Sequence, residues 1–419
     1  MSILSGFRVA GVFLLLSGGA VLAQEEGAAG KVGAGKKPEI SGQFAPVAGP
    51  EEAAEGAPEA RPESAGDAIS EAGAKIASCD AAASNPDDPA FAGQVAQIPP
   101  AQARAAMALC RMALQADPTL ARASYQYGRA ALVAGETRDG IAHLTRAAEA
   151  GYVIAAYDLA EHLRYASDPQ DWAAAMPWYE RAAEGGFALA LNALGMAFEH
   201  GYGGVTPDTT RAAELYEAAY EGGLLLGGTN LGWLLANGDG VDLDERRAVA
   251  LFLEAAEGGV PLGMTDYGYA LANGIGMAQD YVEAAVWFRA AANLGESDAM
   301  LQLGVLYLYG YGVKRNPETA LEWYRKAQDL GAPDALSYIG EVYEKVEEYY
   351  NPGNAAWQYV RALKSGDRWP LERGRSSWDR QTAIELQRIL RDVGLYFGPM
   401  DGDIGTGTRA AMEKVIAGG

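Results

Sequence analysis

The sequence has little of what most enzymes and metal proteins need. Its 419 residues include only two cysteines and three histidines, which leaves few ligands for a metal ion or a redox centre. The motifs G-x-x-x-x-G-K-[ST], H-E-x-x-H, G-x-S-x-G and C-x-x-C are all missing from the sequence. The sequence therefore predicts a protein that is not an enzyme, with no catalytic residue, no cofactor and no metal site.

Positive charge is also scarce. The 33 Lys and Arg residues face 55 Asp and Glu residues, which gives a net charge of −22. A surface this acidic repels phosphate backbones, so the composition argues against nucleic acid as a partner. The 49% hydrophobic and 21% charged content is typical of a folded chain, and the length suggests two or three domains.

No apolar run is long enough to span a membrane, but the first residues have another pattern. Arg8 precedes a short apolar run over residues 9–16, and small residues follow near position 23. This pattern predicts a secretory signal peptide over residues 1–23 rather than a membrane anchor. We therefore expect a periplasmic or secreted protein, from a Gram-negative bacterium, with no membrane span once the signal is removed.

Residues 24–66 are built mainly from Ala, Gly, Glu and Pro, and Phe44 is their one aromatic residue. Such a segment cannot bury enough apolar surface to offset the loss of chain entropy on folding. We expect it to be a disordered tether between the signal peptide and the folded part of the chain.

A nine-residue pattern recurs through the middle of the sequence, as in WYERAAEGG, LFLEAAEGG and WYRKAQDLG. Its final glycines are 35 to 37 residues apart: Gly151, Gly186, Gly223, Gly259, Gly295, Gly331 and Gly366. Nine positions after most of them stands another small residue: Ala160, Gly195, Gly232, Gly268, Gly304 and Gly340. Two interleaved series with one period indicate a repeat protein.

Each repeat has the features of two helices joined by a tight turn. An apolar helical pattern, as over residues 188–198, leads into a Gly-x-Gly turn. A residue that favours helix N-caps then begins the second helix: Asp208, Asp244, Asp280 and Asn316. Such hairpins bury their faces only by stacking, so the sequence predicts an all-α fold, a right-handed α-solenoid over residues 117–366.

The small residues inside the first helices weaken those helices unless they allow close packing. We therefore predict that Gly232 and Gly268 are packing glycines. The tryptophans that share one position of the second helices, Trp178, Trp287 and Trp323, are expected to be core anchors rather than exposed stacking platforms.

The repeats resemble the Sel1-like repeat family, a relative of the tetratricopeptide repeats. The family pattern, A-x-x-x-L-G-x-x-Y-x-x-G-x-G-V followed by D-x-x-x-A-x-x-W-Y-x-x-A-A-x-x-G, is met almost fully over residues 299–331 and well over 190–295. Residues 117–151 look more like a plain tetratricopeptide unit. The resemblance implies a solenoid that binds other proteins, with roles in envelope assembly, polar localisation or signalling control.

If the first helices line the inner surface, as in related repeats, two rows of side chains should project there. The first row follows the small residue of each first helix and the second lies four positions further on. The candidate partner-binding residues are Met196, His200, Trp233, Asn237, Tyr269, Asn273, Val305 and Tyr309. They form a plausible peptide-binding lining. The alternative is that they pack between neighbouring hairpins.

Two cysteines lie before the repeats, in a helical leader expected over residues 67–116. In an exported protein, Cys79 and Cys110 are expected to form one disulfide because the compartment is oxidising. The alternative is a pair of buried free thiols. Similar leaders in exported repeat proteins support the disulfide.

Residues 376–419 depart from the repeat and resemble a small peptidoglycan-binding module. The family pattern, LQ-x-x-L-x-x-x-G-(Y/L)-Y-x-G-x-x-DG-x-x-G-x-x-T-x-x-A, is matched in order from Leu386 to Ala411. The resemblance implies peptidoglycan as a ligand, and its candidate contacts are Tyr396, Asp401, Gly402, Thr408 and Arg409. The alternative is structural, with a turn at Asp401-Gly402 and with Thr408 as a helix residue or cap.

Together these features favour a periplasmic scaffold for protein–protein interaction that is associated with the cell wall through its C-terminal module. The partner protein is not identified by the sequence. The alternative function is an enzyme acting on peptidoglycan, or a hydrolase-accessory protein, with the C-terminal module as its targeting element.

Overall fold

The computed structural model describes residues 63–83, 98–166 and 171–418, and the side chains from residue 73 onward. The expected signal peptide over 1–23 and all but the last residues of the tether over 24–66 lie outside these ranges. Within them the chain is helical, with no strand. None of the helices described there is long and apolar enough to cross a membrane. The helices fall into two compact units, which divide between Gly135 and Glu136.

The first unit contains three mutually contacting helices: α2 (Glu63–Ala83), α3 (Ala103–Ala116) and α4 (Ala121–Val133). Cys79 of α2 and Cys110 of α3 are joined as a disulfide, with their Sγ atoms 2.10 Å apart. Both cysteines are fully buried in the apolar core of this unit. Polar contacts also join α2 to α4, because Asp80 accepts hydrogen bonds from Arg122 and Gln126 of α4.

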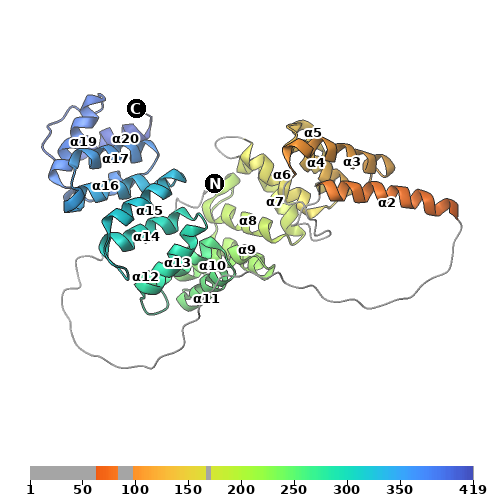
Figure 1. The fold of residues 1–419 in the computed structure, drawn as a ribbon, viewed down its shortest axis with the longest axis horizontal. Coiled ribbons are helices and arrows are strands. Elements are labelled where there is room, and N and C mark those ends of the chain that lie inside the picture. The colour runs from red at the N-terminus through yellow and green to blue at the C-terminus, as the bar shows by residue number, and fades with distance from the viewer. Residues whose placement is uncertain (1–62, 84–97, 167–170, 419) are drawn as a thin grey trace, which may run out of the picture. The chain divides into compact units, whose positions relative to one another are not determined.

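The second unit is a stack of helical hairpins that follow one another along the chain (Figure 1). It begins with α5 (Thr137–Glu149). The hairpins that follow are α6 (Val153–Tyr165) with α7 (Trp172–Glu184), α8 (Ala188–His200) with α9 (Thr209–Glu221), α10 (Leu225–Asn237) with α11 (Glu245–Glu257), α12 (Pro261–Asn273) with α13 (Tyr281–Asn293), α14 (Ser297–Tyr309) with α15 (Pro317–Asp329), and α16 (Ala335–Lys345) with α17 (Pro352–Lys364). Each second helix also contacts the first helix of the next hairpin. This unit has the α-solenoid fold that the sequence predicts, but α4, which the sequence places within the solenoid, belongs to the first unit.

The turns between paired helices have the geometry that their residues suggest. The first helices α8, α10, α12 and α14 all end on a glycine in the left-handed backbone region, with φ between 70° and 80°. Each following second helix begins at an N-cap whose side chain accepts a backbone hydrogen bond: Asp208, Asp244, Asp280 and Asn316. The predicted helix boundaries of these hairpins are therefore confirmed.

In the hairpins from α8 to α17, one aromatic ring of the second helix packs on the glycine inside the first helix. A Cβ placed on Gly232 would lie 2.6 Å from Cε1 of Phe252, and one on Gly268 would lie 2.9 Å from Cε1 of Phe288. No side chain fits at these positions without displacing the ring, so the prediction of packing glycines is confirmed. The same fully buried ring recurs in each second helix: Tyr179, Tyr216, Phe252, Phe288, Tyr324 and Tyr359.

The expectation that Trp178, Trp287 and Trp323 are core anchors is wrong by one position. These tryptophans are only half-buried, and the residue after each of them is the fully buried ring. Trp287 instead packs edge-on against Tyr267 of the first helix beside it. The repeat period shows that the three tryptophans occupy the same position of the repeat. Which of two adjacent aromatic residues is buried depends on the orientation of the second helix.

In two hairpins the hydroxyl of the buried ring is hydrogen-bonded to a glutamate four positions after the small residue, as Tyr216 is to Glu199 and Tyr359 to Glu344. In α8 the carboxylate of Glu199 accepts a 2.6 Å hydrogen bond from Tyr216. In α10 and α12 the equivalent residues are Ala236 and Ala272, and the rings there are phenylalanines. Among the described residues Tyr324 is an exception, because its buried hydroxyl has no hydrogen-bond partner.

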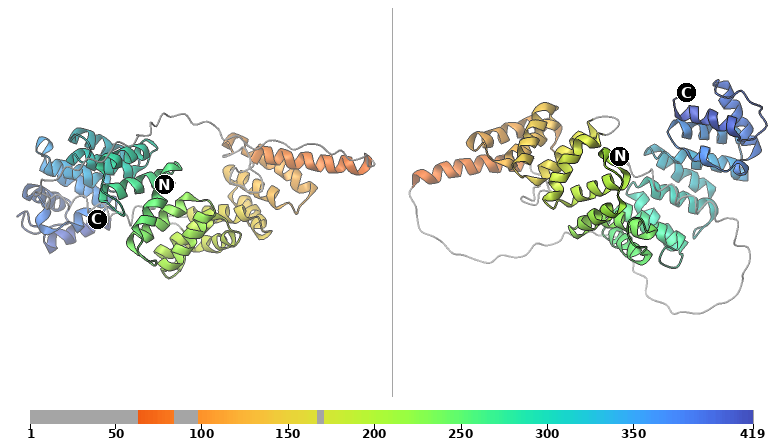
Figure 2. Two further views of the ribbon diagram at one scale, coloured as in Figure 1. Left: turned by 90° about the horizontal axis from the view of Figure 1, so that it is seen from below. Right: turned by 180° about the vertical axis from the view of Figure 1, so that it is seen from behind.

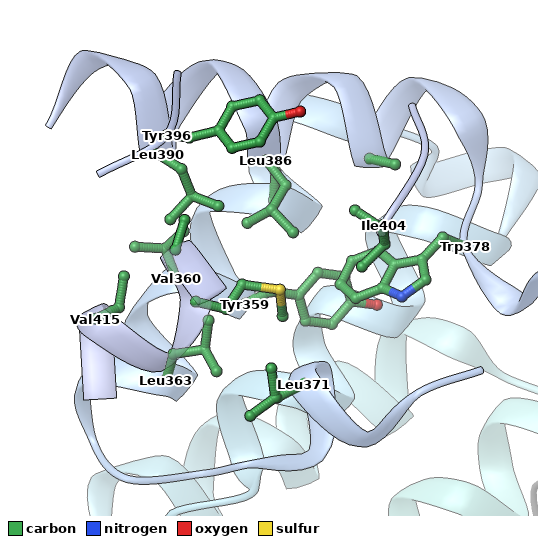
Figure 3. Close-up of a cluster of buried hydrophobic side chains, with 14 of the residues drawn as sticks. Tyr359, Val360, Leu363, Leu371, Trp378, Leu386, Leu390, Tyr396, Ile404 and Val415 are labelled. Atoms are coloured by element: carbon green, nitrogen blue, oxygen red, sulfur yellow. The ribbon is translucent and has the colours of Figure 1, made fainter. Parts of the chain in front are cut away.

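The C-terminal segment packs on the last hairpin and shares its core. It contains α18 (Trp369–Glu372), α19 (Arg380–Asp392) and α20 (Thr406–Ile416). Side chains of α17, α19 and α20 point toward one another around Leu386 and Val360 (Figure 3). Two further views show this segment beside the end of the hairpin stack (Figure 2). The segment therefore covers the face of α17 that a further hairpin would otherwise cover.

A buried ion pair joins the same two parts. Glu344 of α16 lies 2.8 Å from Arg373, and neither side chain is more than 3% exposed. The Arg373 guanidinium lies over the rings of Tyr359, Trp369 and Trp378, while Glu344 accepts a hydrogen bond from the Tyr359 hydroxyl. Burying two charges is tolerated only with such close pairing and hydrogen bonding.

Candidate functional site

Several first helices contact the first helix of the neighbouring hairpin, and together the first helices make up one face of the stack. Among them α8, α10 and α12 contact one another in order, and α14 contacts α16. We call this surface the first-helix face. It carries both rows of residues that the sequence suggests as a partner-binding lining.

The first row is largely used for packing. Val305 is 1% exposed and Tyr269 is 8% exposed. Trp233 is half-buried, and its ring centroid lies 5.4 Å from the rings of both Phe252 and Tyr269. Burial raises the pKa of Tyr269 to about 12. At Val305 and Tyr269 the structure agrees with the alternative of packing between hairpins.

The second row is more accessible. Asn237 is exposed, Tyr309 is 38% exposed, and His200 and Asn273 are half-buried, as is Met196 of the first row. Tyr309 is held in place because its hydroxyl donates to Glu341, 3.3 Å away. Its pKa is raised by burial and by the charge of Glu341. The residues that a partner can contact are therefore spread along the face rather than gathered in one cluster.

Amide side chains add a polar contact beneath this face. The Asn230 amide donates a 2.8 Å hydrogen bond to the Asn192 carbonyl oxygen, and this contact links α10 to α8. Both residues are buried, so they align the neighbouring helices and are not themselves the binding surface.

Three acidic residues lie close to helix ends in the C-terminal part of the stack. Asp298 and Asp334 lie at the starts of α14 and α16, and Asp367 follows α17. Burial, followed by the charges of Asp367 and Asp298, raises the pKa of Asp334 to about 7. Among the residues that the structure describes, no group of His, Cys, Asp and Glu is arranged to hold a metal ion.

In the C-terminal segment, most of the expected peptidoglycan contacts have internal roles. Tyr396 is 6% exposed and Thr408 is 1% exposed. Arg409 donates to the main-chain oxygens of Leu371 and Arg373. These three side chains hold the fold of the segment, and the structural alternative describes them better than the ligand-binding one.

Asp401 and Gly402 form a turn that Gln387 holds in place. The Gln387 amide nitrogen donates to Asp401, 3.1 Å away, and its oxygen accepts from the Gly402 main-chain N–H at 3.0 Å. Gly402 has a φ of +77°, which favours glycine. Asp401 stays exposed, and hydrogen bonds from the Asp403 N–H and Gln387 lower its pKa.

Sequence reasoning missed the most exposed large hydrophobic side chain of the described residues. Phe397 is 85% exposed, in the loop between α19 and α20. It occupies an unspecified position of the resembled pattern, directly after Tyr396. The signal available in the sequence was a second aromatic beside the one that the pattern requires.

Comparison with protein-family models finds five consecutive matches to the Sel1 repeat, at residues 153–187, 188–224, 229–260, 261–296 and 297–331. These matches coincide with the hairpins from α6 to α15. Residues 153–331 are Sel1 repeats. Sel1 repeat proteins generally act as scaffolds for protein–protein interaction and are generally not enzymes.

Solved structures of other proteins resemble the chain. A Sel1 repeat protein from Oxalobacter formigenes is 23% identical, covers 57% of this chain and 96% of its own, and has a TM-score of 0.51. A protective antigen from uropathogenic Escherichia coli with an SLR fold is 23% identical over 74% of this chain and 79% of its own, with a TM-score of 0.38. The first of these supports the solenoid fold of the Sel1 array. Among curated proteins, none matches the sequence.

Proposed function

We propose that the protein is a periplasmic scaffold that binds another protein through the first-helix face of its Sel1 repeats and is held near the cell wall by its C-terminal segment. The observation that supports the scaffold function is the series of five consecutive Sel1 repeat matches between residues 153 and 331. Stacked hairpins present a long surface on rigid elements, which suits recognition of another protein.

Two features support the periplasm as the location. The signal-like pattern over residues 1–23 predicts export. The Cys79–Cys110 disulfide is the kind of bond that persists in oxidising compartments and is rare in the cytosol. Fusion of the first 62 residues to a reporter enzyme that is active only outside the cytoplasm tests export directly, and an inactive fusion would contradict it.

Wall association is supported by the way the motif residues of the C-terminal segment work together. Gln387, Asp401, Gly402 and Thr408 are joined in one hydrogen-bond network that shapes the loop between α19 and α20. A loop fixed by its own side chains presents the remaining residues in a defined arrangement, which favours ligand binding.

Site-specific crosslinking tests the scaffold function. We would replace Asn237 or Tyr309, the most accessible residues of the first-helix face, with a photoreactive amino acid and irradiate intact cells. The control position is Arg246, which is exposed on the second helix α11. We expect positions 237 and 309 to crosslink to one common protein that position 246 does not capture. An identical pattern from all three positions would contradict binding through this face.

A further inference from the structure

The loop between α19 and α20 has an unusual surface. Three large hydrophobic side chains within eight residues are exposed: Val393 at 53%, Phe397 at 85% and Met400 at 40%. Single exposed hydrophobics are common on proteins, but a local group of them suggests a contact surface.

The ring of Phe397 stands on a firmly held part of the chain. The preceding residue, Tyr396, is buried and donates a 2.6 Å hydrogen bond to the main-chain oxygen of Pro399. Arg391 donates to the main-chain oxygen of Gly398. With both neighbours of Phe397 anchored, the loop is already ordered before any ligand binds, and less entropy is lost on binding.

The charged groups of the loop are already paired within the protein. Asp403 forms an ion pair with Arg375, and Asp401 accepts hydrogen bonds from Gln387 and from the Asp403 N–H. A ligand of this loop would therefore contact the aromatic ring of Phe397 rather than a charged side chain.

We propose that Phe397 is the main contact of this segment with the glycan strands of peptidoglycan, an inference that rests on the wall association proposed above. Peptidoglycan carries carboxylates on its stem peptides, and a chain with a net charge of −22 is not attracted to them. Amino-sugar rings present apolar C–H faces that pack against an aromatic ring independently of charge. Val393 and Met400 are further exposed hydrophobic residues of the same segment of sequence.

The test uses the full-length protein and purified sacculi from a Gram-negative bacterium, stripped of bound protein. We would compare pelleting of the parent, Phe397→Ser, Phe397→Trp and a matched control, Leu243→Ser, which removes a 63% exposed residue from a repeat turn. Phe397→Ser should weaken binding by about tenfold or more, as loss of a central aromatic contact does. Phe397→Trp and Leu243→Ser should bind as the parent does.

A competition experiment then separates sugar from peptide. Glycan strands freed of their stem peptides by an amidase should displace the parent from sacculi, and isolated stem peptides should not. Displacement by stem peptides alone would overturn the glycan assignment.

The other outcomes distinguish this inference from the proposal on which it depends. If the parent itself stays in the supernatant, wall association fails and the inference fails with it. If the parent and Phe397→Ser pellet equally, wall association stands and Phe397 is not the contact. Equal losses in Phe397→Ser and Leu243→Ser would show non-specific apolar adhesion and would also overturn the inference.

Discussion

The middle of the hairpin stack and its C-terminal end are held together by different forces. In the middle, Phe252 and Phe288 fill the space above Gly232 and Gly268, and the contacts are apolar. At the end, Tyr359 occupies the same place above Gly340, but its hydroxyl enters an ionic network with buried charges. Equivalent positions of one repeat thus support two kinds of core.

The same contrast appears at the start of the first helices. Leu262 of α12 is buried at the position that Asp334 occupies in α16. Apolar contacts depend mainly on shape and tolerate changes in pH and salt. Buried charges depend on their partners, because an unpaired charge in the interior is strongly destabilising. The two regions should therefore fail under different perturbations.

The largest effect is expected at the C-terminal end, from Glu344→Ala. This change leaves Arg373 buried without its counter-ion and should lower the free energy of unfolding by about 3–5 kcal/mol. Thermal unfolding followed by circular dichroism measures it. As a control, Glu372→Ala removes an exposed carboxylate that lies 3.9 Å from Arg368 and should change stability by less than about 1 kcal/mol. Equal effects of the two variants would show that burial of the Glu344–Arg373 pair does not govern stability at this end of the stack.

A smaller but clear loss is expected in the middle, from Gly268→Leu. The new side chain must displace the Phe288 ring, and such overpacking costs about 1–3 kcal/mol. Urea unfolding at neutral pH measures the loss, which should be nearly the same in low and high salt because no charge is involved. Ala250→Leu, at an exposed position of α11, is the control. A free energy of unfolding equal to that of the parent would contradict the ring-on-glycine packing.

The smallest predicted effect is a pH dependence confined to the C-terminal end. The folded protein binds the Asp334 proton more tightly than the unfolded chain, because the pKa of Asp334 rises from 3.8 to about 7 on folding. Stability should therefore fall as the pH rises from about 4 to about 7. Burial also raises the pKa of Asp367, which adds a contribution of the same sign.

Asp334→Asn should be more stable than the parent by about 1–2 kcal/mol above pH ~7.5. A change of one pKa unit represents roughly 1.4 kcal/mol, and the expected gain is smaller than the full change implies because solvent screens the partly exposed Asp334 carboxylate. Below pH ~4.5 the two should converge. Urea titrations at several pH values provide the measurement, with Asp329→Asn at an exposed site of α15 as the control. Parallel pH profiles for Asp334→Asn and the parent would show that Asp334 does not carry the effect.

The repeat period made the hairpins, the turns and the packing glycines predictable from sequence. Glycine at a fixed register has few explanations, and close helix contact is the one that the structure shows at Gly232 and Gly268. Which side chains of the first-helix face stay accessible was not predictable in the same way. Val305 and Asn237 lie in rows that follow the same helices, yet one is buried and the other exposed, because burial depends on the neighbouring hairpins.

The C-terminal segment shows the same limit in another form. A pattern of specified residues suggested ligand contacts at Tyr396, Thr408 and Arg409, whereas the structure uses these side chains internally. Residues that a fold requires at fixed positions are recognisable by their spacing. A residue that contacts a ligand at the surface, as we propose for Phe397, is not required by the fold. Its position therefore follows no fixed spacing in the sequence, and a pattern of spacings does not reveal it.

The covered face of α17 has a consequence for how such a chain can change in length. In the middle of the stack each hairpin presents to the next a face like the one it receives, so a duplicated unit of about 36 residues could be inserted there and would be accommodated on both sides. After α17 no such site exists, because the shared core with α19 and α20 is shaped for one partner only. The array can therefore grow or shrink by internal duplication and deletion, whereas a hairpin inserted directly after α17 would have to displace the C-terminal segment from the core that they share.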